Sequence, residues 1–140
     1  MAYNIFVDSD IIIDFLVERE LFFKDAKLLF SFATLDKIKL HTSTLIYANV
    51  FYILRKEFPT AVVKSKLIEL SKLVQIVNTT NESTISALNS DFPDFEDAVQ
   101  YYTAIENKCS FLITRNTKDF KKAKNIRVLT SSQFCKLFVK

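Results

Sequence analysis

The sequence contains no glycine, and this absence excludes two large classes of nucleotide-binding site. The Walker A loop and the dinucleotide-binding fingerprint both need glycine where the backbone turns closely around a phosphate. Any phosphate chemistry of this 140-residue chain must therefore use a site other than a glycine-rich loop.

Cysteine, histidine and long apolar runs are also scarce. Cys109 and Cys135 lack the spacing of metal or redox motifs, so we expect two buried, reduced thiols. His41 is the single histidine and follows an apolar run, where a structural role is expected. No apolar stretch reaches the roughly 18 residues of a membrane span, and the N-terminus does not resemble a signal peptide. We expect a cytoplasmic protein without a membrane segment.

Short apolar runs alternate with amphipathic stretches along the whole chain. The predicted strands are 3–7, 38–42, 74–78, 110–114 and 126–130. The predicted helices are 10–18, 23–35, 44–58, 61–73, 81–89, 94–107 and a last helix that starts near 130. Connections long enough to be helical predict parallel strand pairing. We expect one domain over residues 1–140, of the α/β class: a three-layer α/β/α sandwich around a central parallel sheet of about five strands.

Three signals mark helix ends. Asp94 is a candidate N-cap, with acids in the following turn where the helix dipole favours them. The stretch TSSQ, residues 130–133, has the pattern of a capping box. Pro59 is expected to end the helix predicted over 44–58.

Polar residues gather where two predicted strands end. The first strand leads directly into Asp8, with Asp10 close behind, and the fourth leads into the stretch TRNTKD, residues 114–119. Ligands of parallel sheets bind beyond the carboxyl ends of the strands, so these residues meet if the two strands are neighbours. The helix before the fourth strand opens with Asp94, Glu96 and Asp97, which join the same edge.

Several carboxylates close together repel one another unless a cation lies between them. Oxygen ligands favour Mg²⁺ or Mn²⁺ over zinc. Asp94 as a cap and Glu96 as dipole compensation also have structural explanations, and Asp97 in the first turn has one too. Asp8 is harder to explain structurally, because it lies between a buried strand and the apolar run at residues 11–13.

Charge is distributed unevenly along the chain. Residues 73–107 contain six acids and no lysine or arginine, whereas residues 108–140 contain nine basic residues and one acid. The basic tail is either a solvated surface or a cationic rim beside an anionic centre. The second arrangement suits a polyanion such as a nucleic acid.

Four stretches resemble PIN-domain proteins of the kind found as VapC-type toxins in bacterial toxin–antitoxin pairs. They are IFVDSDIIIDFLVERE, TSTLIYANVFYILRK, DFEDAVQYYTAIENKCSFLITRNTKDF and IRVLTSSQF, and they are distributed from residue 5 to residue 134. The resemblance implies the same α/β/α fold, and Mg²⁺- or Mn²⁺-dependent cleavage of RNA. It also implies a homodimer and an antitoxin partner that caps the site.

The resemblance assigns roles to individual residues. Asp8, Asp97 and Asp119 match metal-holding acids, and Asn116 shares the last position with Asp119. The hydroxyl of Thr114 matches a group that braces the site, and Asp94 and Glu96 are supporting acids. The middle helix of the family normally supplies a glutamate, but this chain has Asn49 there, which brings no charge to a metal. Four basic residues are expected to hold the RNA backbone: Arg115, Lys118, Lys121 and Lys122.

Two other interpretations stay open. The start IFVDSDI is similar to haloacid-dehalogenase-like phosphatases, with Asp8 as nucleophile and Asp10 as general acid, but the acidic stretch DFEDA precedes the threonine strand instead of following it. The second alternative is a degenerate PIN domain that binds nucleic acid or a protein partner without cleavage, because Asn49 and Asn116 replace acids.

Overall fold

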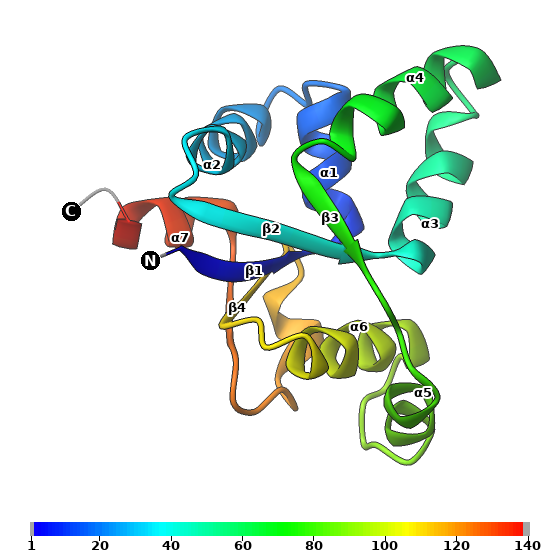
Figure 1. Cartoon of the computed structure of the whole chain (residues 1–140), viewed down its shortest axis with the longest axis vertical. Coiled ribbons are helices and arrows are strands. Elements are labelled where there is room, and N and C mark those ends of the chain that lie inside the picture. Colours follow the sequence, from blue (N-terminus) through cyan, green and yellow to red (C-terminus); the bar gives the residue numbers. More distant parts are fainter. Residues whose placement is uncertain (1, 139–140) are drawn as a thin grey trace.

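The computed structural model of the chain describes residues 2–138 and forms a five-stranded parallel sheet (Figure 1). The strands are β1 (Tyr3–Val7), β2 (Ile38–Ser43), β3 (Val74–Val77), β4 (Phe111–Ile113) and β5 (Arg127–Leu129). Their order across the sheet is β3-β2-β1-β4-β5, and all four neighbouring pairs are parallel. The expected central parallel sheet is confirmed.

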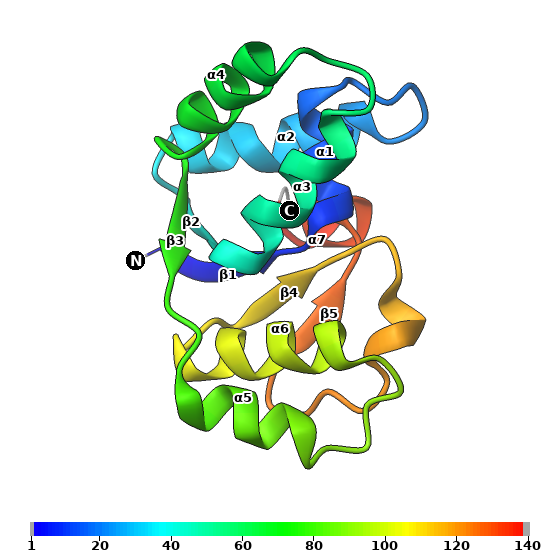
Figure 2. The ribbon, with the colours of Figure 1, turned by 90° about the vertical axis from the view of Figure 1, so that its right-hand side faces the viewer.

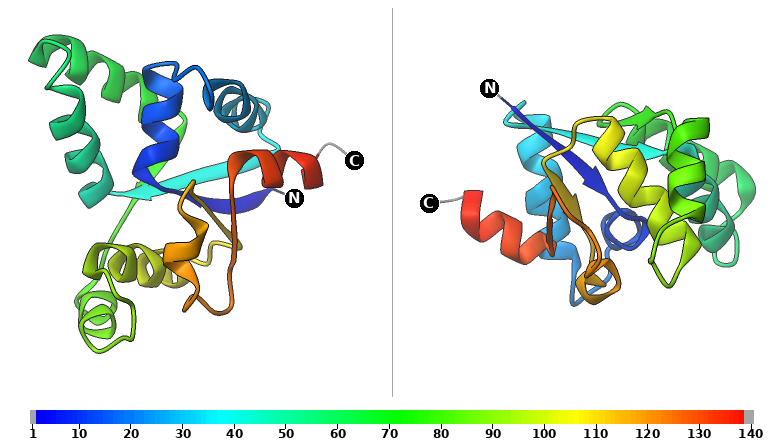
Figure 3. Two further views of the ribbon diagram at one scale, coloured as in Figure 1. Left: turned by 180° about the vertical axis from the view of Figure 1, so that it is seen from behind. Right: turned by 90° about the horizontal axis from the view of Figure 1, so that it is seen from below.

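Helices cover both faces of this sheet. They are α1 (Ser9–Leu16), α2 (Phe23–Thr34), α3 (Thr44–Leu54), α4 (Thr60–Leu70), α5 (Asn81–Leu88), α6 (Phe95–Glu106), the 3₁₀ helix η1 (Thr117–Phe120) and α7 (Ser131–Phe138). Helices α1 to α4 lie on one side of the sheet, and α5 with α6 lies on the other (Figure 2). Seen from behind, α7 lies near α2 (Figure 3), against which it packs. The three-layer sandwich is confirmed.

The pairing of β1 with β4 fixes the position of the candidate site. Val7 at the end of β1 lies opposite Ile113 at the end of β4, so the two strands finish at the same level. The chain adds β2 and β3 on one side of β1 and then crosses to add β4 and β5 on the other. The gap between β1 and β4 is therefore the topological switch point where such sheets bind ligands.

The core is apolar and rich in phenylalanine. Ile5, Phe6 and Val7 of β1 are completely buried, and the rings of Phe15 and Phe30 stack at 4.2 Å between centroids. Cys109 and Cys135 are free and buried, as the sequence indicates. No helix within residues 2–138 is long and apolar enough to cross a membrane.

Two predicted capping interactions are confirmed. Asp94 Oδ1 accepts a hydrogen bond of 3.0 Å from the backbone N–H of Asp97. Thr130 and Gln133 form a reciprocal capping box, in which each side chain accepts a hydrogen bond from the backbone N–H of the other. Helix α3 is shorter than predicted: it ends at Leu54, and residues 55–58 form turns that lead to Pro59.

Three helices end in left-handed backbone without the glycine that favours it. Glu18 follows α1 with φ of 52°, Asp36 follows α2 with φ of 58°, and Lys108 follows α6 with φ of 59°. Glycine is the usual residue at this position, since a side chain there costs about 1–2 kcal/mol. These three helix ends are therefore less stable than they would be with glycine at the left-handed position.

Replacing Asp36 with glycine is expected to stabilise the protein by about 0.5–1 kcal/mol, because relief of the left-handed strain exceeds the added entropy of the unfolded chain. Lys37→Gly is the matched control, since Lys37 has no positive φ and should lose about 0.5–1 kcal/mol. Urea denaturation of both variants measures the difference. Equal destabilisation by the two substitutions would contradict the interpretation of Asp36.

Candidate active site

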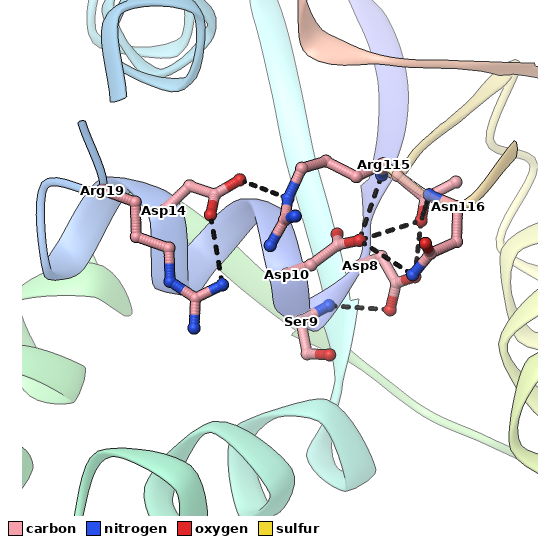
Figure 4. A network of polar contacts seen from close by, with 8 residues as sticks. Asp8, Ser9, Asp10, Asp14, Arg19, Arg115 and Asn116 are labelled. Carbon is pink, nitrogen blue, oxygen red and sulfur yellow. Dashed lines mark hydrogen bonds and ion pairs between the residues drawn. The ribbon is translucent and has the colours of Figure 1, made fainter. Parts of the chain in front are cut away.

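Asp8 lies at the centre of a group of hydrogen bonds at the end of β1. Its Oδ1 atom accepts a bond of 2.7 Å from the backbone N–H of Ser9 and so caps α1 (Figure 4). Its Oδ2 atom accepts a bond of 2.8 Å from the hydroxyl of Thr114, which follows β4 and is fully buried. Asp8 is itself 7% exposed. The hydroxyl of Thr114 therefore holds the carboxylate of Asp8, which follows β1, beside the end of β4.

Asp10 ties the segment after β4 to the start of α1. Its Oδ2 atom accepts hydrogen bonds from the backbone N–H of Arg115 at 3.1 Å and from the side-chain amide of Asn116 at 3.4 Å (Figure 4). Its Oδ1 atom is buried and has no hydrogen-bond partner within the described residues. Asn116, a predicted site residue, therefore lies beside the acids that follow β1.

Asp14 adds a third carboxylate one turn further along α1. It is 1% exposed, and its Oδ2 atom accepts a 2.9 Å bond from Nε of Arg115, while Arg19 lies 3.7 Å from Oδ1. The Arg115 guanidinium also lies 4.1 Å from the ring centroid of Phe22. Arg115 is one of the residues predicted to hold RNA. Its Nε atom links the segment after β4 to α1.

Sequence reasoning left Asp14 out of the site, although it is an acid within the apolar run of residues 11–16. An acid within an apolar run is the signal in the sequence that could have identified Asp14, because a buried carboxylate needs a partner.

Acids from α6 and η1 face the same centre. Burial and then the neighbouring carboxylates of Asp94, Asp8, Asp119 and Glu96 together raise the pKa of Asp97 to about 7. These acids come from three separate segments, and their charges all affect the side chain of Asp97. The structure therefore brings together the acids that the sequence predicted to converge.

A cavity of about 350 Å³ opens beside these acids. It is lined by Pro93, Asp94, Asp97, Lys118, Asp119, Lys121 and Lys122. Three of the four predicted RNA-contacting basic residues therefore share a cavity with two of the three predicted metal-holding acids. The arrangement is an anionic centre with a cationic rim.

The chemistry of the acids suits a divalent cation. Burial and the charge of Asp10 together raise the pKa of Asp8 to about 6, so ionisation at this edge is unfavourable without a counter-charge. The Oδ1 atom of Asp10 accepts no hydrogen bond within the described residues, so this oxygen could coordinate a metal ion. Within residues 2–138, no three histidine, cysteine or acidic side chains are close enough to hold a metal by themselves. The oxygen donors fit Mg²⁺ or Mn²⁺, with substrate or water completing the coordination.

Asn49 lies on α3 and is half-buried. The spacing of apolar residues in this helix predicts a buried stripe through Leu45, Ala48 and Tyr52, with Asn49 at its edge. This prediction is wrong, because Tyr52 is 69% exposed. The buried face contains Ile46, Val50 and Leu54 instead, since α3 packs against α1 along this row. Within residues 2–138 the hydrogen-bonded group around Asp8 does not include Asn49.

Comparison with known proteins agrees with this geometry. The model of the PIN domain family matches residues 4–118. The chain belongs to the PIN domain family. Its sequence is 28% identical over 136 residues to Ribonuclease VapC1 of Aquifex aeolicus, covering 94% of this chain and 93% of the relative.

Two solved structures share the PIN fold with this chain. VapBC-1 from nontypeable Haemophilus influenzae aligns with a TM-score of 0.68 at 14% identity, over 92% of this chain and 98% of the other. The VapC20 toxin of Mycobacterium tuberculosis, described as cleaving the sarcin-ricin loop, aligns with a TM-score of 0.68 at 16% identity, over 88% and 98%. The similarity to haloacid-dehalogenase-like phosphatases is therefore set aside.

The raised pKa of Asp8 makes a prediction about stability and pH. The folded pKa of about 6 exceeds the ordinary value of 3.8, so the unfolded chain ionises first as the pH rises. Asp8 therefore penalises folding increasingly between about pH 4 and pH 7, and not below. Without metal, Asp8→Asn should gain stability relative to wild type by roughly 2 kcal/mol across this range.

Urea denaturation in EDTA at several pH values measures this gain. The exposed Asp91, substituted with asparagine, is the control and should give a flat difference. A pH-independent difference for Asp8→Asn would show that its carboxyl group is not destabilised in the folded protein.

Proposed function

We propose that this protein is a metal-dependent endoribonuclease of the PIN type, acting in the cytoplasm as the toxin of a toxin–antitoxin pair. The observation that carries the proposal is the single cavity in which Asp97 and Asp119 face three lysines, beside Asp8. The named ribonuclease VapC1 is the relative that supports RNA as the substrate. Structures of VapBC complexes support an antitoxin as the partner.

Asp8, Asp97 and Asp119 would hold Mg²⁺ or Mn²⁺, with Asp94 and Glu96 as supporting acids. A bound divalent cation supplies positive charge to the scissile phosphate and favours ionisation of the attacking water. Thr114 keeps Asp8 oriented through its 2.8 Å hydrogen bond. Asn116 would orient the attacking water through its amide oxygen, since its amide nitrogen donates to Asp10. Asn49 would contribute a second amide from α3.

The cationic rim would hold the RNA backbone on either side of the cleaved bond. Lys118, Lys121 and Lys122 line the cavity, and Arg115 lies at the opposite end of the same segment. Lysine and arginine at these positions place positive charge where the phosphates enter, which favours binding of any RNA sequence.

Exposed apolar side chains support a protein partner. Tyr52 and Ile53 on α3 and Ile68 on α4 are exposed to solvent. We propose that an antitoxin and a second copy of the chain cover such surfaces, giving a homodimer that the antitoxin inhibits.

The alternative function is binding of nucleic acid or a protein partner without cleavage. Asn49 favours it, because an amide replaces the usual acid and weakens attraction for a metal.

Asp8→Asn is expected to abolish Mn²⁺-dependent RNA cleavage, with a rate loss of roughly 100-fold or more, because the carboxylate facing the metal is lost. Single-turnover cleavage of a labelled RNA measures the rate, and Asp91→Asn is the control with the same charge change. Wild-type protein that binds RNA but never cleaves it with Mn²⁺ would support the non-cleaving alternative.

Replacing Lys118, Lys121 and Lys122 with alanine should weaken RNA binding and flatten its salt dependence by up to ~2 in log–log slope. A triple replacement of the exposed Lys37, Lys56 and Lys64 removes the same charge elsewhere and should change the slope much less. Fluorescence anisotropy over a salt series measures both. Identical slopes for the two triple variants would mean that the rim lysines do not contact RNA.

Asn49→Glu should lower the stability of the metal-free protein by about 1 kcal/mol, because it adds a repelling carboxylate. It should also enlarge the rise in melting temperature that Mn²⁺ produces. Asn49→Gln matches the size without the charge and should show neither effect. Equal destabilisation of Asn49→Glu with and without Mn²⁺ would show that Asn49 is a packing residue distant from the metal.

A further inference from the structure

A second cavity, of about 410 Å³, lies beside the candidate active site. Its volume falls within the range of about 300–1,000 Å³ that is common for sites of small ligands. Arg115 and Asn116 line this cavity and also donate hydrogen bonds to Asp10. A ligand in this cavity is therefore separated from the acids by only the segment after β4.

Two buried polar atoms of residues that line the cavity have no hydrogen-bond partner within the described residues. They are Oδ1 of Asp14, which is 1% exposed, and Oγ of Ser131, which is 6% exposed. Buried polar groups are nearly always hydrogen-bonded in folded proteins. The Ser131 hydroxyl is therefore available to a ligand that offers a carbonyl acceptor. Oδ1 of Asp14 has an ion-pair partner in Arg19 at 3.7 Å but accepts no hydrogen bond from any described residue, so a ligand with an N–H donor can supply one.

The charges around the cavity nearly cancel. Asp14 and Asp25 contribute two negative charges to the lining, and Arg115 contributes one positive charge, with Arg19 3.7 Å from Asp14. A strongly charged ligand of either sign gains little from this balance. A neutral ligand with polar edges fits it better.

The rest of the wall is apolar. Leu21 is 84% exposed at the cavity, and Phe22 and Ile11 add further apolar surface. An aromatic wall beside hydrogen-bonding side chains is how proteins bind the splayed bases of single-stranded RNA. The cavity thus combines an apolar surface that a base can stack on with side chains that can hydrogen-bond to the edge of that base.

We propose that this cavity binds a guanine base of the RNA substrate, next to the phosphate that is cleaved; this rests on the proposed ribonuclease function. Guanine presents two adjacent N–H donors, at N1 and N2, which match the carboxylate of Asp25 and the Oδ1 atom of Asp14, which accepts no hydrogen bond within the described residues. Its O6 atom accepts from the Ser131 hydroxyl. Adenine, cytosine and uracil each present a single donor group on the corresponding edge, so the cavity selects guanine.

Binding of labelled hexaribonucleotides tests the proposal without cleavage. The probes are hexauridylate and three versions in which one central uridine is replaced by guanosine, adenosine or cytidine, measured by fluorescence anisotropy in EDTA at constant salt. The guanosine hexamer should bind wild-type protein about tenfold more tightly than the other three.

Asp25→Asn should abolish this preference, because it replaces a two-acceptor carboxylate with one acceptor and one donor. Asp36→Asn makes the same change outside the cavity, at the other end of α2, and should keep the preference. Ser131→Ala is a second variant that should reduce the preference several-fold while leaving hexauridylate binding unchanged.

The outcomes separate the two proposals. Equal binding of all four hexamers by wild type, or a full guanosine preference in Asp25→Asn, overturns the guanine site but leaves the ribonuclease proposal standing. Failure of every hexamer to bind overturns RNA as the substrate, and the guanine site with it.

Discussion

The hydrogen bond between the Thr114 hydroxyl and Asp8 joins the two halves of the molecule at the point where function is concentrated. It depends on the parallel pairing of β1 with β4, which ends both strands at the same level. Without this pairing the acids after β1 would lie far from the segment after β4. The hydrogen bonds of Asp10 to Arg115 and Asn116 depend on it in the same way.

At this edge of the sheet, one carboxylate has a cationic partner and other carboxylates do not. Buried Asp14 has a half-buried partner in Arg115, so its charge is used for structure. Among residues 2–138, Asp8 and Asp97 have no such partner, and their pKa values rise to about 6 and about 7 because of burial and neighbouring acids. A divalent cation would neutralise the negative charge of these two carboxylates. Arg115 thus allows one carboxylate to be buried for stability while the others remain available for chemistry.

The absence of glycine has a cost in the fold and none at the site. Helix ends such as those at Asp36 and Lys108 adopt left-handed backbone with a side chain present. The site instead uses carboxylates, a hydroxyl and lysines, none of which requires the backbone to approach a phosphate closely. A nucleotide site built only from side chains is therefore compatible with a chain that has no glycine.

The sequence by itself determined the parallel sheet, the order of strands and helices along the chain, and that Asp8, Asp97 and Asp119 converge if the first and fourth strands are neighbours; the pairing of β1 with β4 was decided by the tertiary structure. The expectations from the sequence follow from local periodicity, and from the rule that polar residues after parallel strands share one edge. Tertiary structure alone decided which face of α3 is buried, so the predicted stripe through Tyr52 failed: with apolar residues all around the helix, packing on α1 selects the row.

Tertiary structure also decided that Asp14 pairs with Arg115, since the two residues are 101 positions apart in the chain. The second cavity likewise depends on α1, α2 and α7 meeting beside the segment after β4. Contacts between distant segments leave no periodic signal in the sequence, because any acid and any arginine could form them. The fold alone selects which of them meet.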